Sequence, residues 1–437
     1  MKPKVAIFWF RRDLRFSDNR GLFEALTGEY PVLPIFIFDK NILENLSEFD
    51  PRVSFIYKRL QQLREELVER QKASIGIFYG QPLEVIKSLT NQYDVKAVLT
   101  NRDYEPYALK RDSEISRTLE KLDISFKTYK DQVIFEQDQV VKDDGKPYVV
   151  YTPFMRKWKA LFSSLKPSLF YDSDSLLKNC YQNVDLPNVS LAEMGFKEST
   201  IQVPSYNIED DLIGRYQETR DIPSLEKGTS KLGPHLRFGT ISVRQVVIKA
   251  QRSSQETFLN ELIWREFFMQ ILWHFPKTVH KAFKPKYDRI AWRNNKEDFE
   301  KWKNGNTGYP LVDAGMRELN TTGFMHNRVR MLVASFLCKH LLIDWRWGEA
   351  YFAEKLLDFE LSSNIGNWQW AAGSGVDAAP YFRIFNPTTQ VQKFDKDLLY
   401  IQKWVPELQE LNYPNKMVDH KEARERCLRV YKEALQA

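Results

Sequence analysis

KVAIFWF, residues 4–10, is a short run of apolar and aromatic residues that leads directly into Arg11 and Arg12. Its shortness and its basic end are typical of a buried strand and unlike the apolar core of a signal peptide. Four similar runs follow at residues 30–39, 74–80, 96–101 and 124–130. Together these five runs predict the strands of a sheet within the first 130 residues.

Helical patterns separate these runs. Between the second and third runs, apolar residues recur at steps of three and four: Val53, Ile56, Leu60, Leu63 and Leu67. Further helical patterns cover residues 82–93 and 106–122. Alternating strands and helices predict an α/β domain with a doubly wound, Rossmann-like parallel sheet, which binds ligands beyond the carboxyl ends of its strands. A G-x-G-x-x-G or P-loop motif is missing, which argues against a classical dinucleotide or P-loop site.

The remaining chain changes character twice. Residues 131–200 are rich in Asp, Ser, Asn and Pro and are predicted to be a linker with a helix near residues 153–165. From residue 201 to 437 helical periodicity dominates, and nine of the eleven tryptophans lie there. We therefore expect an α/β domain at 1–130, a linker at 131–200 and an all-α domain at 201–437.

Composition limits the possible classes of protein. The 437 residues suit two domains, and the net charge of +6 allows an anionic partner without proving one. Cys180, Cys338 and Cys427 lie far apart, which argues against a disulfide framework or a short-spaced metal pair. No apolar stretch could span a bilayer. We expect a soluble, cytoplasmic, monomeric protein, associated with the nucleoid if it is bacterial, with no membrane partner.

Three segments could carry chemistry, although each also has an ordinary structural explanation. Phe258, Glu261, Trp264, Arg265 and Phe268 share one face of a predicted helix that is apolar elsewhere, as in a ligand site or a structural ion pair. The glycine- and hydroxyl-rich loop at residues 228–239 suits phosphate oxygens, or is a plain capped turn. Residues 277–303 interleave nine Lys or Arg with five aromatics, as in a nucleic-acid surface or a solvated helix face.

NIGNWQWAAGSGVDAAPYFRIFNP, residues 364–387, is much more specific. Five further motifs accompany it in order: WFRRDLR (9–15), ELIWREF (261–267), TGYP (307–310), MHNR (325–328) and DWR (344–346). Over nearly its whole length the chain therefore resembles the DNA photolyase/cryptochrome family, and most of all the class I photolyases that repair cyclobutane pyrimidine dimers.

This resemblance implies an antenna domain followed by a helical domain that binds FAD. In the family, excited reduced flavin donates an electron to the dimer, the cyclobutane ring splits, and the electron returns. The positions that match the family's FAD contacts are Tyr216, Thr229, Ser230, Lys231, Leu232, Gly233, Phe258, Glu261, Arg265, Arg330, Asp358, Phe359, Glu360 and Asn364. Family members often carry Ser at the position of Gly233, so a backbone contact alone is expected there.

Four residues match positions that act in the family's electron transfer. Asn364 would lie beside the redox-active ring nitrogen of the flavin, where plant-type cryptochromes carry Asp and animal-type ones Cys. Trp368, Trp345 and Trp292 match the family's tryptophan chain, with Trp368 nearest the flavin and Trp292 at the surface. The asparagine favours repair over signalling.

The resemblance also implies a site for DNA that contains pyrimidine dimers. The pocket for the flipped-out dimer would be lined by Glu261, Trp264, Asn327, Met331 and Trp370. Phosphates around it would be held by Arg220, Arg328, Arg383, Gln390 and Lys393. Members that repair the pyrimidine-pyrimidone adduct carry His in place of Asn327, which argues against that substrate.

The antenna chromophore stays open between a folate, a deazaflavin and a flavin. Folate-using members usually carry a Glu where the loop at residues 103–112 has Ala108, and its Glu-Pro-Tyr pattern resembles the deazaflavin- and flavin-using members more. Two alternative functions also stay open: a cryptochrome photoreceptor that signals with the same flavin, and a flavin-binding DNA protein without catalysis.

Overall fold

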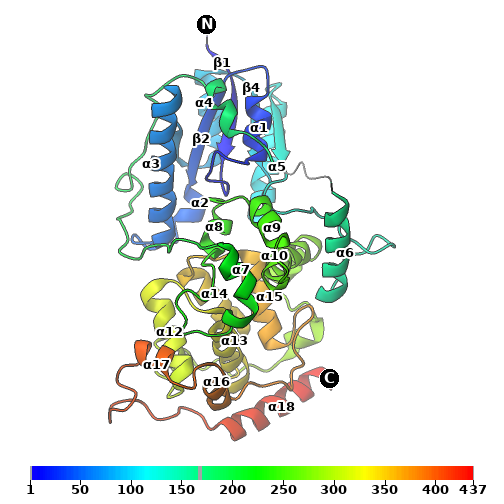
Figure 1. Cartoon of the computed structure of the whole chain (residues 1–437), viewed down its shortest axis with the longest axis vertical. Coiled ribbons are helices and arrows are strands. Elements are labelled where there is room, and N and C mark those ends of the chain that lie inside the picture. The colour runs from blue at the N-terminus through cyan, green and yellow to red at the C-terminus, as the bar shows by residue number, and fades with distance from the viewer. Residues whose placement is uncertain (1, 166–169, 437) are drawn as a thin grey trace. The chain divides into compact units, whose positions relative to one another are not determined.

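The computed structural model describes residues 2–165 and 170–436 (Figure 1). Packing divides the chain into two compact units. The first consists of residues up to 136, 164–205 and 232–252, and the second of residues 137–163, 206–231 and those from 253 onward. The sequence instead predicts boundaries at residues 130 and 200, and these stay a prediction.

The first unit contains the predicted sheet. Its strands are β1 (Lys4–Phe10), β2 (Val32–Asp39), β3 (Gly76–Gly80), β4 (Asp94–Asn101) and β5 (Ser125–Tyr129). They pair in the order β3-β2-β1-β4-β5, and every pair is parallel. Because β1 stands between β2 and β4, the chain reverses direction along the sheet at β1, which is the doubly wound topology. The predicted α/β fold is confirmed.

Helices pack on both faces of this sheet. One face is covered by α1 (Arg20–Leu26) and α3 (Pro51–Gln71), and the other by α4 (Pro82–Gln92) and α5 (Pro106–Glu120). The unit also contains α2 (Lys40–Leu43), α8 (Gly233–Arg237), α9 (Val243–Gln251) and a 3₁₀ turn η1 (Asp174–Asn179). Successive side chains of β1 alternate between two cores, with Phe8 and Phe10 in one and Ile7 and Trp9 in the other. The predicted apolar stripe of α3 is buried at Leu60, Leu63 and Leu67.

Buried ion pairs hold α9 to the sheet. Asp131 lies 2.6 Å from an Arg15 nitrogen and 2.7 Å from an Arg244 nitrogen, and Asp18 lies 3.1 Å from Arg244 Nε. These side chains are almost inaccessible to solvent, so each charge needs its partner. This network explains why residues 232–252 pack with the α/β unit although they follow it at a distance in the sequence.

The secondary structure of the second unit is helical in its described residues, as predicted, apart from an isolated bridge between Val141 and Pro147. Its α-helices are α6 (Tyr151–Ser164), α7 (Asp210–Thr219), α10 (Thr257–His274), α11 (Lys296–Lys303), α12 (Pro310–Thr322), α13 (Asn327–Ser335), α14 (Trp345–Lys355), α15 (Leu361–Ala372), α16 (Pro387–Phe394), α17 (Leu399–Trp404) and α18 (His420–Gln436). Two 3₁₀ turns, η2 (Pro276–Val279) and η3 (Pro285–Arg289), and a π-helical turn, η4 (Phe336–His340), complete it. None of the helices in residues 2–165 and 170–436 could cross a membrane.

Candidate functional site

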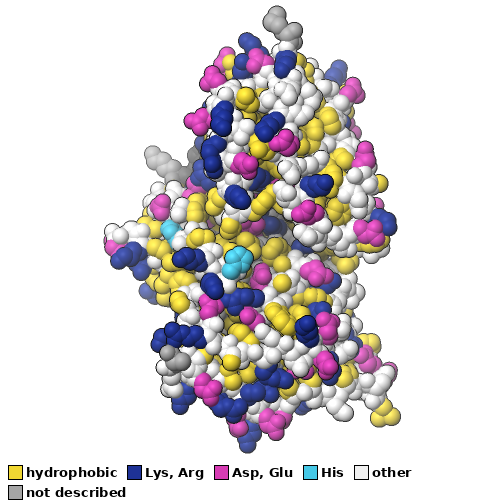
Figure 2. Space-filling model, turned by 180° about the vertical axis from the view of Figure 1, so that it is seen from behind, with side chains coloured by type: hydrophobic (Ala, Val, Ile, Leu, Met, Phe, Trp, Pro, Cys, Tyr) yellow, Lys and Arg dark blue, Asp and Glu magenta, His cyan; other side chains and the backbone are white. Residues whose placement is uncertain are grey.

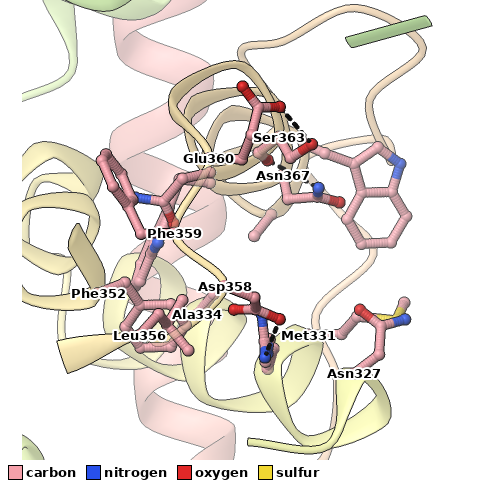
Figure 3. A pocket seen from close by; sticks show the side chains of 15 residues that line it. Asn327, Met331, Ala334, Phe352, Leu356, Asp358, Phe359, Glu360, Ser363 and Asn367 are labelled. Carbon is pink, nitrogen blue, oxygen red and sulfur yellow. Dashed lines mark hydrogen bonds and ion pairs between the residues drawn. The ribbon is translucent and has the colours of Figure 1, made fainter. Parts of the chain in front are cut away.

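A cavity of about 100 Å³ opens in the helical unit between α13, α14 and α15 (Figure 3). Its walls combine apolar side chains with a few polar groups, as in sites for organic cofactors. The lining residues are Asn327, Arg330, Met331, Ala334, Phe352, Leu356, Asp358, Phe359, Glu360, Ser363, Asn364, Asn367, Trp368, Trp370 and Ala371. Nine of these were predicted from the sequence as cofactor, electron-transfer or dimer-binding residues, so one cavity brings the three groups together.

An ion pair forms part of the cavity wall. Arg330 donates through both terminal nitrogens to the Asp358 carboxylate, at 3.1 and 2.9 Å, and through Nε to the Met325 carbonyl at 2.7 Å. The planar guanidinium therefore has a fixed orientation. Glu360 accepts a hydrogen bond from the Ser362 hydroxyl at 2.6 Å. Charged groups are thus positioned before any ligand binds.

Asn364 is held by a residue that the sequence analysis missed. Its Nδ2 donates to Glu349 Oε1 at 2.9 Å and to the Glu349 carbonyl at 3.0 Å. Burial raises the pKa of Glu349, while the hydrogen bond from Asn364 lowers it. Glu349 comes from α14 and Asn364 from α15, so no local motif could have linked them. With Nδ2 engaged, the amide oxygen of Asn364 is the group left to interact with a ligand.

Trp368 lies against an aromatic core beside the cavity. Its ring centroid is 5.0 Å from that of Phe352 and 6.2 Å from that of Trp302. Only glycine fits at position 348, because a Cβ there would lie 2.1 Å from a Trp368 ring carbon. Trp345 is also buried, and Trp292 is half-buried. Exposure therefore increases toward Trp292, the predicted outer end of the chain.

A second cluster joins α7 to α10. An Arg220 terminal nitrogen lies 2.5 Å from Glu261 Oε1, and Tyr216 packs edge-on against Phe258 with ring centroids 5.0 Å apart. Burial and the Glu261 carboxylate raise the pKa of Tyr216 to about 12. Four predicted residues therefore meet here. The predicted phosphate ligand Arg220 is paired with the carboxylate of the predicted dimer-binding residue.

Trp264 has a partner that the sequence did not reveal. The ring of Tyr151 stacks on it with centroids 3.6 Å apart and planes 6° apart, and the Tyr151 hydroxyl donates to the Asn260 carbonyl at 2.8 Å. Tyr151 lies in the predicted linker, where no motif marked it. Phe268 also stacks on Trp264 with centroids 5.5 Å apart, and Phe267 packs edge-on at 5.6 Å. Trp264 is therefore held in an aromatic cluster and is only partly accessible to a ligand.

Unsatisfied polar groups lie in the loop predicted to bind phosphates and at the start of α13. Thr229 Oγ1 and His326 Nε2 are both buried without a hydrogen-bond partner in the described part of the chain. Lys231 adopts a left-handed backbone conformation, and its ammonium lies 3.7 Å from the Phe324 ring centroid. Burial, followed by the charges of Lys231 and Arg330, lowers the pKa of His326 to about 3. This donor set fits an anionic group such as the phosphates of FAD.

Other residues of this loop differ in their setting. Ser230 is buried, and its carbonyl accepts from the Asn207 amide. Leu232 and Gly233 belong to the α/β unit, where they begin the five-residue helix α8. Such a short helix has only a small dipole, so the expected help from a helix N-terminus is slight. His326, which the sequence analysis also missed, caps α13 by accepting from the Arg328 amide.

The predicted phosphate ligands other than Arg220 lie on α13, on α16 and in the loop before α16. Arg328 lies 2.5 Å from an Asp221 carboxylate oxygen, and its guanidinium carbon lies 4.4 Å from the Phe394 ring centroid. The Lys393 ammonium lies 5.2 Å from the same ring. Arg383 is exposed beside Phe385, and Gln390 is half-exposed on α16. Aromatic side chains thus support several of these cations.

Family models match most of the chain. A model described as the DNA photolyase family matches residues 6–170, and one described as the FAD binding domain of DNA photolyase matches residues 258–412. A deoxyribodipyrimidine photo-lyase from Halobacterium salinarum is 36% identical over 98% of this chain and 99% of its own length.

Solved structures agree with these matches. A class III photolyase from Agrobacterium tumefaciens, 32% identical, has a TM-score of 0.88 over 100% of this chain and 99% of its own. An archaeal photolyase from Sulfolobus tokodaii with two FAD molecules, 34% identical, has a TM-score of 0.79 over 98% and 100% of the two chains. A Synechocystis cryptochrome, 26% identical, has a TM-score of 0.86 over 98% and 99%. From its fold, its cavity and its full-length relatives, this chain belongs to the DNA photolyase family.

Proposed function

We propose that this chain repairs cyclobutane pyrimidine dimers in DNA by a light-driven reaction that uses noncovalently bound FAD. The observation that carries the proposal is the shared cavity, where Arg330, Asp358 and Asn364 lie on the same walls as Asn327, Met331 and Trp370. A cofactor held by the first group would therefore be close to a base held by the second. Such proximity is what electron transfer to a substrate requires.

FAD would be held by residues of the cavity and by residues of the predicted phosphate-binding loop. Arg330 and Asp358 would orient it, the Asn364 amide oxygen would face its ring, and Thr229 and Lys231 would approach its phosphates. When bound, FAD supplies light absorption and the electron that splits the dimer and is then returned. The protein's own contribution is to exclude water and to fix the orientation of the two reactants.

A dimer stacked within a duplex would have to be flipped out to reach the cavity. Trp370 offers an aromatic face, Asn327 offers amide hydrogen bonds, and Met331 offers an adaptable apolar contact. Glu261 and Trp264 would complete the pocket from α10. Weakened base pairing at the lesion lowers the cost of flipping, which favours damaged over intact DNA.

Binding of the surrounding DNA would depend on particular basic side chains. Lys and Arg are interspersed with Asp and Glu on the face shown in Figure 2, so net charge alone would not orient a duplex there. Arg220, Arg328, Arg383 and Lys393 would contact phosphates, with Gln390 as a neutral donor. Such contacts fix the register of DNA without reading its sequence.

A second chromophore would pass light energy to the flavin. Its identity stays a prediction among folate, deazaflavin and flavin types. The Sulfolobus tokodaii photolyase with two FAD molecules supports a flavin as one candidate. In this chain, Ala108 of the expected antenna loop is buried.

A cryptochrome photoreceptor is the second candidate function, because the Synechocystis cryptochrome shares the fold with a TM-score of 0.86. The class I assignment also stays a prediction, because a class III photolyase has a TM-score of 0.88 with this chain.

The deciding experiment is repair under blue light. Purified protein with chemically reduced FAD is mixed with an oligonucleotide that contains one cyclobutane thymine dimer, and intact thymines are quantified after illumination and in the dark. We expect restoration only in the light. FAD binding without any light-dependent restoration would favour the photoreceptor.

A further inference from the structure

The loop between α15 and α16, residues 373–386, presents its tip to solvent. Phe382 is 60% exposed, and the Arg383 side chain beside it is exposed as well. Inside the tip, the Arg383 amide donates to the Pro380 carbonyl at 2.9 Å and the Ile384 amide to the Phe382 carbonyl at 3.1 Å. These short-range bonds shape the tip but do not attach it to the helical unit.

Ile384 and Phe385, which follow the tip, pack against apolar cores of the helical unit. At Arg383 itself a buried lysine provides a hydrogen bond. Lys339 Nζ donates to the Arg383 carbonyl at 2.9 Å, across 44 residues of sequence. Lys339 is only 1% exposed, although lysine is rarely buried so completely. Its ammonium thus reaches through the core to the backbone of the residue whose guanidinium faces solvent.

The backbone around Lys339 is adapted to this direction. Phe336–His340 form a π-helical turn, closed by the Leu341 amide donating to the Phe336 carbonyl, and all five residues of the turn are buried. A π turn is uncommon and often marks a functional position. Lys339 therefore lies at an irregular and fully buried point of the backbone.

Burial of this ammonium is costly, and packing alone does not require it. Burial lowers the pKa of Lys339, and among the described residues the charged or titratable groups that act on it are the thiols of Cys427 and Cys338 and the guanidinium of Arg383, with no carboxylate. An apolar side chain of similar length would avoid this cost, since buried charges are often replaceable without loss of stability. A role in holding one conformation explains the lysine better.

Neighbouring contacts hold other parts of the loop. Tyr381 stacks on Tyr431 of α18 with ring centroids 5.8 Å apart, and the Tyr431 hydroxyl donates to the Ala372 carbonyl at 3.1 Å. These contacts fix the start of the loop and the residue before its tip. Lys339 is the residue that bonds the backbone of Arg383 itself.

We propose that Lys339 is a positioning residue for DNA binding, which holds the backbone of Arg383 so that its guanidinium meets a DNA phosphate. This inference rests on the proposed function, because it takes Arg383 as a phosphate ligand. Without the bond from Lys339, Arg383 would keep its charge but lose its fixed position. DNA affinity would fall although no group that touches DNA had changed.

The test is a double-mutant cycle on the FAD-loaded full-length protein. Lys339→Met, Arg383→Ala and the double variant are titrated with one duplex, intact or carrying a thymine dimer, over a range of salt concentrations. Loss of one phosphate contact lowers the logarithmic salt slope by about 0.9, or about five-fold in affinity at 0.15 M salt. We expect Lys339→Met to approach this loss on both duplexes, and the double variant to lose no more than Arg383→Ala.

Two controls separate positioning from general damage. Lys286 is exposed and also faces a backbone carbonyl, that of Leu435 at 3.4 Å, so Lys286→Met removes a similar charge without touching the loop. Any effect of Lys286→Met should add to that of Arg383→Ala. The flavin absorption spectrum and the photoreduction of FAD should be the same in Lys339→Met and the wild type, because the cavity is unchanged.

The outcomes separate the two proposals. If Arg383→Ala weakens DNA binding but Lys339→Met does not, or if their losses add, Lys339 has no positioning role. If Arg383→Ala has no effect, the phosphate contact assumed in the proposed function is wrong, and this inference falls with it, while light-driven repair is tested separately. If Lys339→Met and Lys339→Gln both lose FAD, Lys339 is required for folding and the inference is rejected.

Discussion

Trp9 and Trp368 are both buried tryptophans, but their surroundings are opposite. Trp9 is the last residue but one of β1, near the carboxyl edge of the sheet, and the guanidinium carbons of Arg11 and Arg111 lie 4.9 and 4.8 Å from its ring centroid. Asp112 holds Arg11 at 2.7 Å. Trp368 instead faces the cavity of the helical unit and packs against the neutral rings of Phe352 and Trp302.

This difference shows that the charges around a buried tryptophan decide whether it is suited to donate an electron. Removing an electron from an indole leaves a positive charge, and a cation a few ångströms away in a partly desolvated site opposes it. Trp9 is thus poorly suited to electron donation, whereas Trp368 lies among neutral rings beside a cofactor cavity. The α/β unit uses its buried charges to join segments, and the helical unit directs polar groups into an open space.

The largest expected effect tests this comparison directly. Trp368→Phe should abolish photoreduction of oxidised FAD, because the first electron donor is lost, while chemically reduced enzyme should still repair dimers. Trp9→Phe, the matched change in the other unit, should leave photoreduction intact. Both are measured by bleaching of flavin absorption under blue light with an external reductant. The contrast breaks down if Trp9→Phe slows bleaching equally, or if reduced Trp368→Phe cannot repair.

A second prediction concerns the cavity's ion pair. Arg330→Met removes the guanidinium that the proposed function assigns to orienting FAD, and a hydrogen bond to a charged group contributes about 1.5–3 kcal/mol, so the FAD dissociation constant should rise about 10- to 150-fold. The FAD dissociation constant is measured by titrating the apoprotein with FAD and following the flavin fluorescence.

Arg317→Met is the matched control for that variant. Its pair with Glu407 has similar exposure, at 22 and 25%, against 23 and 16% for the Arg330–Asp358 pair. Arg317 does not line the cavity. Equal loss of FAD in the two variants would mean that general stability, and not the cavity, accounts for the effect.

A smaller effect is expected at Trp264. Stacking on an aromatic ring is worth about 1–3 kcal/mol per base, so Trp264→Ala should reduce the preference for dimer-containing over intact duplex by about 5- to 150-fold. Tyr151→Phe removes only the hydroxyl that donates to Asn260 and should keep the preference. The preference of each variant is measured by titrating it with the dimer-containing duplex and with the intact duplex. Full preference in Trp264→Ala would exclude Trp264 from the dimer pocket.

The smallest expected effects concern the pH dependence of the free energy of unfolding. The contributions of one carboxyl group in each unit should change with pH in opposite directions. Burial raises the pKa of Glu349 above 4.5, so its contribution to stability is present below pH 4.5 and is lost as the pH rises through the raised value. For Asp131, burial raises the pKa, but Arg15 and Arg244 outweigh it and lower the pKa below 3.8. Its contribution is present above pH 3.8 and is lost as the pH falls.

Chemical denaturation at several pH values checks both signs. Relative to Glu349→Gln, the wild type should lose free energy of unfolding as the pH rises above 4.5. Relative to Asp131→Asn, it should lose free energy of unfolding as the pH falls below 3.8. The same direction in both variants would contradict the contrast between the two units.

Local pattern was sufficient for most of the fold. The predicted run at residues 30–39 corresponds to β2 (Val32–Asp39), because a buried parallel strand is a continuous apolar run bounded by turns. The run at residues 124–130 corresponds to β5 (Ser125–Tyr129), a partly exposed strand at the edge of the sheet. The stripe from Val53 to Leu67 lies within α3, because apolar residues at steps of three and four fall on one buried face of a helix. The predicted boundaries at residues 130 and 200 came from composition, which cannot report how buried charges regroup segments such as residues 232–252.

The sequence by itself determined the element types, the parallel doubly wound sheet and, through the family resemblance, the residues Asn327, Met331, Asn364 and Trp370 that line one cavity. Those properties depend on periodicity and on motifs that lie within single helices. Only the tertiary structure decided the partners: Glu349 for Asn364, Tyr151 for Trp264 and Lys339 for Arg383. These pairs join side chains from different elements, and their contact depends on how the elements pack, which no local pattern encodes.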